Sequence, residues 1–306
     1  MGTTTTGLGT APGYPNYSGN YIPEIWSTKL QVKFYAATAL TDIANTDYEG
    51  DITAQGDKVY IRTTPDFTIG DYKKGQNLDY EVPDSPSIEL LIDKGKYYAF
   101  VTDVVDINRA DVKLIDNFSQ GAANDLRTAI ETDVWASIPA EADSANQGAT
   151  AGAVSGNIDL GTTGSPLALT AGNIVETLID AGTVLDEQNV PDDGRYVILP
   201  SKLCGTIKKS DLGQVDVSGD AQSIRRNGRV GMIDRFTVYR SNILSQDAGK
   251  FSCLFGQKTA LTFASALTEH DSLKSETTFG YKNRGLQVYG YKVVKPESLG
   301  VIVATI

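Results

Sequence analysis

The chain has 306 residues, of which 41% are hydrophobic and 21% charged, so it can bury the core of one large domain or two modest ones. Its 38 acidic and 27 basic residues give a formal net charge of −11, which disfavours an exterior built to bind nucleic acid or an anionic membrane. The single histidine, His270, leaves little material for histidine-based triads or zinc sites, and two cysteines are too few for a disulfide framework.

The N-terminal residues 1–24 are rich in Gly, Thr, Pro and Asn. This composition predicts an extended arm that becomes ordered only where it packs against another surface. The apolar spacing that follows predicts a short helix over residues 25–40.

Two alternating segments, residues 58–62 and 88–92, predict β-strands. Residues 65–87 between them hold three prolines, two glycines and no apolar run, so they have no core of their own. We therefore expect a hairpin that projects from its domain and is stabilised by another chain. Tyrosines are frequent in and near it and suit extended interfaces; they are Tyr60, Tyr72, Tyr80, Tyr97 and Tyr98.

The strongest helical pattern covers residues 109–138, where apolar residues recur every four positions from Leu114 to Val134 and Pro139 ends the pattern. Such a helix would be about 40 Å long at 1.5 Å per residue. Residues 139–168 contain no aromatic residue, lysine or arginine, which predicts an insertion or flexible loop between two units.

The rest of the chain alternates helices and strands. The pattern predicts helices over 171–188 and 201–209 and strands over 195–200, 236–239 and 251–255. The last forty residues are expected to be mostly strand, at 274–281, 286–295 and 301–306.

Few residues could act in catalysis or bind a metal, and their neighbours in the sequence are typical of turns and polar connections. The carboxylate groups Asp192-Asp193 and Asp42/Asp47/Asp51 lie beside turn-forming residues, and His270 lies in a polar connection. We expect no catalytic residue, metal or cofactor, and we expect the two cysteines to be buried apolar residues.

Charge is unevenly distributed, with a balance of −17 over residues 1–200 and +6 over residues 201–306. The basic residues concentrate at Arg225, Arg226 and Arg229, with Lys208-Lys209 upstream. These side chains could face solvent, nucleic acid, or an acidic segment of a neighbouring subunit such as Asp79-Tyr80-Glu81.

The order of these elements resembles the major capsid protein of tailed double-stranded-DNA bacteriophages, an α+β fold. Gly56–Ile61 with Ile69–Tyr72 is similar to the ascending strand and tip of that family's extended loop, and Ile88–Lys94 to its descending strand. Val190–Pro200 resembles the helix-to-strand turn of its axial domain. Gly231–Asn242 resembles a later hairpin, although Asp234-Arg235 stands where a glycine is expected.

The resemblance implies a division of the chain into parts: an N-terminal arm (1–47), an extended loop (48–104), a peripheral domain with a spine helix at 109–138 (105–168), an axial domain (169–270), and terminal strands that return through the peripheral domain (271–306). It implies a structural protein, not an enzyme, that forms hexamers and pentamers of an icosahedral shell around DNA. Virion localisation, assembly in the host bacterial cytoplasm, and scaffolding, portal and decoration or cement proteins as partners follow from the same resemblance.

The residues expected at contacts between subunits are Tyr60, Tyr72, Lys73, Lys74, Tyr80, Glu81, Arg225, Arg226 and Arg229. Some relatives link subunits through a lysine and an asparagine, for which Lys73, Lys74 and Asn283 are the candidates here. Two other readings stay open: the shell of a bacterial nanocompartment that holds enzyme cargo, and an α/β enzyme that uses carboxylates in residues 169–270.

Overall fold

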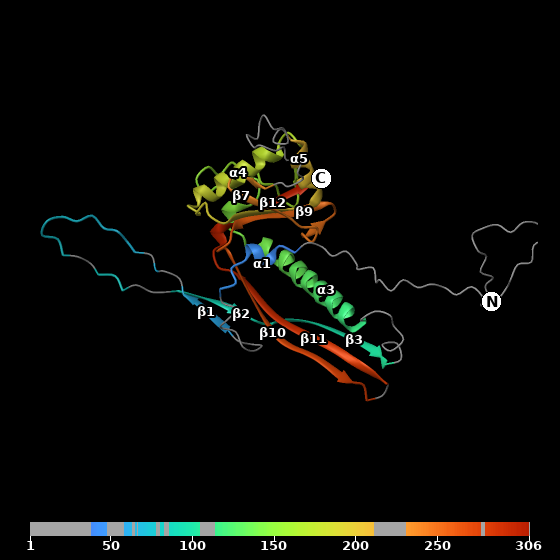
Figure 1. The fold of residues 1–306 in the computed structure, drawn as a ribbon. Coiled ribbons are helices and arrows are strands. Elements are labelled where there is room, and N and C mark those ends of the chain that lie inside the picture. The colour runs from blue at the N-terminus through green and yellow to red at the C-terminus, as the bar shows by residue number, and fades with distance from the viewer. Residues whose placement is uncertain are drawn as a thin grey trace, which may run out of the picture.

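The computed structural model describes residues 38–47, 58–62, 65, 67–77, 80–82, 86–104, 114–210, 231–276 and 279–305. Two units share the chain (Figure 1). The α/β unit holds a sheet with two helices, and the elongated unit holds one long helix beside long strands. A hairpin extends away from both units.

The predicted arm lies outside the described residues, as does most of the helix expected at 25–40. A short helix, α1 (Leu40–Ile43), begins where that helix was expected to end.

A seven-stranded mixed sheet forms the centre of the α/β unit. Its strand order is β4-β12-β9-β5-β7-β6, and β8 pairs with the first two residues of β9, Lys250 and Phe251. Strand β5 is buried along its whole length, as the apolar run Tyr196–Leu199 that follows its first residue predicts. The strands are β4 (Leu167–Ala168), β5 (Arg195–Leu199), β6 (Met232–Ile233), β7 (Phe236–Arg240), β8 (Gln246–Asp247), β9 (Lys250–Gln257) and β12 (Leu299–Thr305).

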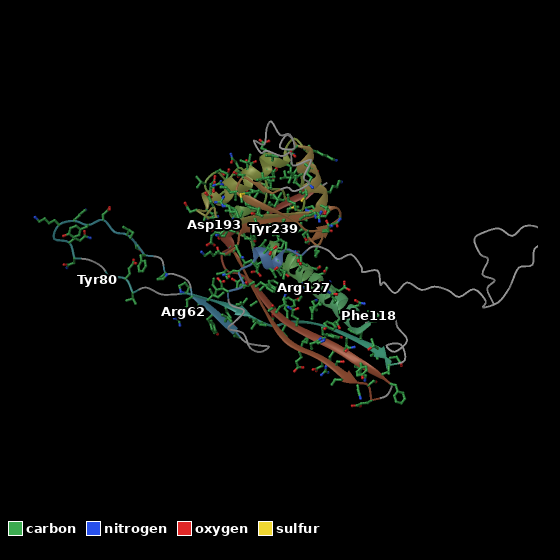
Figure 2. The ribbon with its side chains drawn as sticks, viewed as in Figure 1. Arg62, Tyr80, Phe118, Arg127, Asp193 and Tyr239 are labelled. Atoms are coloured by element: carbon green, nitrogen blue, oxygen red, sulfur yellow. The ribbon has the colours of Figure 1, made fainter. Side chains whose placement is uncertain are left out.

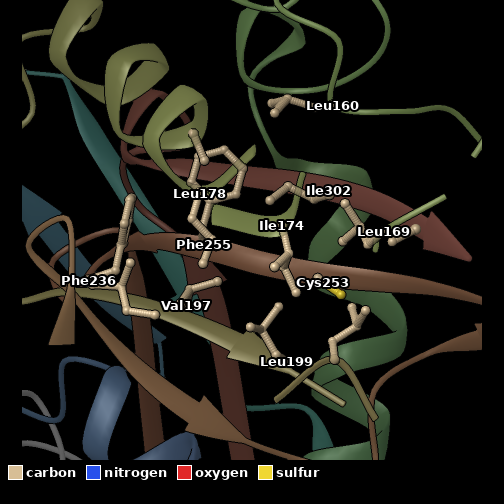
Figure 3. Packing of buried hydrophobic residues seen from close by; sticks show 14 of the residues in the cluster. Leu160, Leu169, Ile174, Leu178, Val197, Leu199, Phe236, Cys253, Phe255 and Ile302 are labelled. Carbon is tan, nitrogen blue, oxygen red and sulfur yellow. The ribbon is translucent and has the colours of Figure 1, made fainter. Parts of the chain in front are cut away.

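Two helices, α4 (Ile174–Glu187) and α5 (Ser201–Lys209), cover one face of this sheet, close to their predicted positions. Helix α4 buries Ile174 and Leu178 against the sheet, where Phe236 and Phe255 meet edge to face with ring centroids 6.1 Å apart (Figure 3). The four-residue spacing of its apolar positions places them on one side of the helix and leaves the other side to solvent.

The elongated unit combines α3 (Leu114–Ser137) with a three-stranded antiparallel sheet, in the order β10-β11-β3. The long helix predicted at 109–138 is confirmed over its described part. Helix α3 packs beside β3, where Phe118 meets Phe100 edge to face at 6.0 Å. The strands are β3 (Lys94–Asp103), β10 (Leu261–Lys274) and β11 (Gly280–Val293).

A second apolar core joins the two units. It contains Trp135 and Val134 of α3, Leu40 and Ile43 of α1, and residues from the second face of the seven-stranded sheet such as Ile198. Glu131 of α3 lies in this core with only 1% of its surface exposed. Its carboxylate accepts hydrogen bonds from the Ala39 N–H at 3.1 Å and from the Trp135 indole at 2.8 Å. The carboxylate therefore fixes the residues that lead into α1.

The prediction of a flexible loop at 139–168 is wrong. This segment forms η2 (Ile138–Glu141), η3 (Ser144–Asn146) and β4, and it packs along β12. The buried Asn146 side chain donates to the carbonyls of Glu297 and Leu299 at 2.7 and 3.0 Å. Ala151 and Leu160 are fully buried. Small residues close the sheet edge here without needing aromatic side chains. The start of the segment also contacts the elongated unit, where Glu141 pairs with Lys292 of β11 at 3.2 Å.

The terminal strands differ from the prediction as well. A strand was expected at 274–281, but β10 ends at Lys274 and β11 begins at Gly280, so residues between them form the connection. His270 lies in β10 opposite Gly285, not in a polar connection. Strand β12 does not stay in the elongated unit, since it is the neighbour of β9 in the seven-stranded sheet. A polar sequence such as Glu269–Asp271 forms a strand here because β11 supplies its partner.

Candidate assembly surfaces

The hairpin is fixed at its root and exposed beyond it. Strands β1 (Lys58–Arg62) and β2 (Ser87–Leu91) pair in antiparallel fashion, as predicted. Ile61 and Leu90 are buried against the three-stranded sheet, in a core shared with Ile92, Ala264 and Val288. An ion pair between Lys58 and Glu89 closes the exposed side of the pair. The root is therefore an integral part of the elongated unit.

Beyond the root, every described residue from 67 to 77 and from 80 to 82 is exposed. Figure 2 shows Arg62 at the root and Tyr80 far from both units. Large apolar side chains are among the most exposed: Ile69 is 91% exposed and Val82 92%. A contiguous set of this kind marks a contact with another molecule. The predicted contact residues Tyr60, Tyr72 and Tyr80 are 60%, 70% and 89% exposed.

The hairpin keeps a defined shape through its own polar contacts. The Thr68 N–H donates to Glu81 at 3.2 Å across the two arms, and these contacts with Thr68 lower the pKa of the Glu81 carboxyl. At the tip, Lys73 and Gln76 exchange hydrogen bonds, with Gly75 at φ +87°. Lys73 and Lys74 thus project from a tight turn, while Glu81 acts within the hairpin.

One face of the three-stranded sheet is uncovered, a surface that the sequence did not predict. Alternate residues of β3 point away from α3, and Tyr97 and Val101 are 77% and 61% exposed. Leu273 of β10 is 48% exposed on the same sheet, and Arg284 pairs with Asp271 at 2.8 Å. Apolar side chains bordered by charges form a surface suited to a second protein. Its signal in the sequence was the alternation of residues 94–103, which is visible only once the strand is known.

The other face of this sheet carries a chain of aromatic contacts. Because Gly285 has no side chain, the Tyr98 ring lies across it, and a Cβ there would come within 2.5 Å of the ring. The Tyr98 hydroxyl reaches Nδ1 of His270 at 2.7 Å. His270, the only histidine of the chain, therefore links β10 to β3 across the intervening strand β11, and its hydrogen-bond partner is Tyr98.

The basic residues Arg225, Arg226 and Arg229 lie outside the described residues. Lys208 and Lys209 lie in the last turn of α5, where positive charge suits the helix dipole. The prediction that this region contacts a neighbouring subunit remains a prediction.

Among the carboxylates considered for catalysis, Asp192 forms ion pairs within the chain, and Asp51 lies outside the described residues. Asp186 and Asp192 share two guanidinium groups: Arg195 lies 2.7 and 3.1 Å from them and Arg235 lies 2.8 and 2.7 Å away. Hydrogen bonds from Arg235 and Arg195 outweigh partial burial and lower the pKa of Asp186, away from the range of a general acid or base at neutral pH. Arg235 lies in the turn at Asp234-Arg235, where both residues have positive φ.

The two cysteines are buried, and the two best-defined hollows are not lined by Asp192 or Asp193. These two hollows of the described surface measure about 490 and 600 Å³. Burial raises the pKa of the Cys204 thiol and raises that of Cys253 to about 12. Within the described residues no group of three or more metal-binding side chains occurs, and no helix there is long and apolar enough to cross a membrane.

The candidate cross-link acceptor is also enclosed. Asn283 lies in β11 with 2% of its surface exposed, and its amide group faces the Thr102 hydroxyl at 3.5 Å. A lysine of another subunit has no path to this amide without displacement of the strand.

Comparison with known proteins identifies the family that has this architecture. A family model for phage capsid proteins matches residues 88–304. The chain belongs to the phage capsid protein family. A search of curated proteins finds no match. Among solved structures, that of Mycobacterium phage Che8 is 25% identical with a TM-score of 0.76, over 93% of this chain and 98% of that one.

Two more distant structures share the fold. The capsid of cyanophage P-SCSP1u is 15% identical with a TM-score of 0.74, over 100% of this chain and 99% of the other. The capsid of a native GTA particle is 10% identical with a TM-score of 0.64, over 94% and 97%. The expected α+β major capsid fold is confirmed, and the protein is a shell-forming capsid protein whose family role is structural.

Proposed function

We propose that this capsid protein forms hexamers and pentamers of an icosahedral shell that encloses phage double-stranded DNA, and that it catalyses no reaction. The observation that carries the proposal is the hairpin, which is anchored at Ile61 and Leu90 and fully exposed at its described tip. Its apolar side chains have no partner among the described residues of their own chain, so a second copy would cover them.

The uncovered sheet face is the surface that this second copy would offer. Tyr97, Val101 and Leu273 present apolar area there, and the Ile69, Tyr80 and Val82 side chains of a neighbour's hairpin have matching chemistry. Each such contact is small, but it is repeated around every ring and across the shell, so modest affinities add up to a stable particle.

The proposed setting of the particle follows from its role. The net charge of −11 suits a coat that does not retain the genome during packaging. Assembly would take place in the host bacterial cytoplasm, with scaffolding, portal and decoration or cement proteins as partners. A nanocompartment shell would share this architecture, and the contents of purified particles, DNA or enzyme, separate the two.

Deletion of residues 66–86 tests the role of the hairpin. The shortened chain should stay folded and soluble, because the root core remains, but should no longer form closed particles by electron microscopy and sedimentation. Replacing Ile69, Tyr80 and Val82 together by Ser should have the same effect with the hairpin length unchanged, since these exposed side chains add little to the stability of the isolated chain. Normal shells from both variants would refute the proposal.

A further inference from the structure

The outer side of α4 carries an acidic ridge, which we define as Glu176, Ile179 and Asp180. The inner side of the helix is buried, so these residues lie on the side that faces solvent. Ile179 is 48% exposed, an apolar side chain between two carboxylates. Among the described residues neither carboxylate forms an ion pair, although Asp186, further along the same helix, pairs with two arginines.

The ridge is unfavourable in the isolated chain. Glu176 and Asp180 are four residues apart, where like charges on a helix repel. Partial burial and the neighbouring Glu176 raise the pKa of Asp180. Glu176 lies in the first turn and gains from the helix dipole, but Asp180 lies beyond the reach of that effect. A cation supplied from outside the described chain would relieve this repulsion.

A basic surface lies around the start of α5 and the end of β7. We define it as Lys202 and Arg240, which are exposed and form no ion pair among the described residues. The two segments are tied together, since the Ser201 hydroxyl donates to the Asn242 side chain at 2.6 Å. Helix α5 contains Lys202, Lys208 and Lys209 and no acidic residue, so the whole helix adds positive charge to this region.

The two surfaces lie on different elements of the α/β unit: the ridge on α4, and the basic surface at the start of α5 and the end of β7. Helices α4 and α5 cover the same face of the sheet. In Figure 1, α4 lies toward the side to which the hairpin extends, and α5 lies toward the other side. Two different, complementary surfaces of one subunit can form a head-to-tail contact between copies, and such contacts form closed rings when the rotation between copies allows it.

We propose that the acidic ridge of one subunit docks on the basic surface of the next copy in the same ring. Lys202 and Arg240 then approach Glu176 and Asp180, and the contact covers Ile179. This inference rests on the proposed assembly into hexamers and pentamers. Charge pairing of this kind selects the partner and its orientation and also speeds association.

Charge reversal tests the contact. A ridge variant (Glu176→Lys with Asp180→Lys) and a basic-surface variant (Lys202→Glu with Arg240→Glu) should each lower the yield of closed particles about tenfold or more, while circular dichroism and thermal unfolding of the unassembled chains stay near wild type. The variant with all four substitutions should recover to within about twofold of wild type, because the attraction is restored with its sign reversed.

A matched control separates pairing from net charge. The ridge variant combined with Lys258→Glu and Lys295→Glu, both exposed, has the same net charge as the four-substitution variant but no complementary surface. It should not recover. Co-expression of the ridge and basic-surface variants should produce six-membered rings and few closed shells, because two subunit types can alternate around six positions but not around five.

The outcomes distinguish this inference from the proposed function. If the wild-type chain forms no shell even with its scaffolding partner, the proposed function fails. If wild-type shells form and both reversal variants assemble normally, or if recovery occurs in the net-charge control, only the docking contact is overturned. Normal particles from the basic-surface variant that lack DNA would assign Lys202 and Arg240 to the genome, and that result would also overturn the contact.

Discussion

At the scale of single residues, Glu131 of α3 shows how the chain holds a buried charge. It is buried in the core that joins the two units, and backbone and indole N–H groups hold its carboxylate. Glu131→Leu would leave these donors unpaired, and we expect a loss of about 2–4 kcal/mol in the free energy of unfolding. Urea unfolding followed by circular dichroism measures this loss. An unchanged stability would show that the donors find other acceptors.

The same carboxyl predicts a pH dependence. Burial raises the pKa of Glu131 above that of the unfolded chain. Its favourable contribution is therefore complete below the unfolded pKa and is lost as pH rises through the folded pKa. Glu131→Gln cannot titrate, so the stability of wild type relative to this variant should fall as pH rises above the unfolded-state pKa of glutamate, about 4.3. A difference independent of pH would contradict the assignment.

At the scale of elements, Gly290 sets the position of the hairpin root. A Cβ at this residue of β11 would lie 2.3 Å from the Leu91 carbonyl oxygen, at the end of β2. Gly290→Ala should therefore displace the root, destabilise the chain by about 1–3 kcal/mol and reduce shell yield. Gly95→Ala in the neighbouring β3 is the control, since its Cβ would make only ordinary van der Waals contacts, with Leu286 at 3.8 Å and the Gln287 carbonyl oxygen at 4.0 Å. Equal effects in thermal unfolding would show that close approach is not the cause.

Elements with a strong local pattern were predictable from the sequence, and those defined by partners were not. Helices α3 and α4 follow from their apolar periodicity, and β5 from its unbroken apolar run. The strand identity of Glu269–Asp271 depends on pairing with β11. The packing of Ala151 and Leu160 depends on β12, which lies far along the chain.

Likewise, one of the assembly surfaces could be predicted from the sequence and the others could not. The exposed tyrosines of the hairpin were predictable because their segment has too few apolar residues to bury them. The uncovered sheet face depends on the register of three strands, which aligns Val101 of β3 and Leu273 of β10 on either side of Lys282 only in the folded chain. The acidic ridge requires knowing which side of α4 is buried.

At the scale of the whole molecule, the core around Trp135 makes the two units one mechanical body. Trp135 is 1% exposed and contributes to a cluster that contains residues of α1, α3 and both sheets. A subunit with such a joint enters a shell as a rigid piece, and the hairpin and the contacts between subunits then supply the adjustment that different ring sizes require. Deformation within the joint would instead disturb a close-packed interior.

This rigidity predicts how the chain unfolds. Because both units share the Trp135 core, the unassembled chain should unfold in one cooperative transition by calorimetry. Trp135→Ala should lower the free energy of unfolding by about 3–5 kcal/mol without splitting that transition. Phe118→Ala, on the same helix but 45% exposed, removes one aromatic pair and should lower it by about 0.5–1.5 kcal/mol. Two separate transitions in the wild-type chain would mean that the units unfold independently. Movement at the core around Trp135 would then supply the adjustment that different ring sizes require.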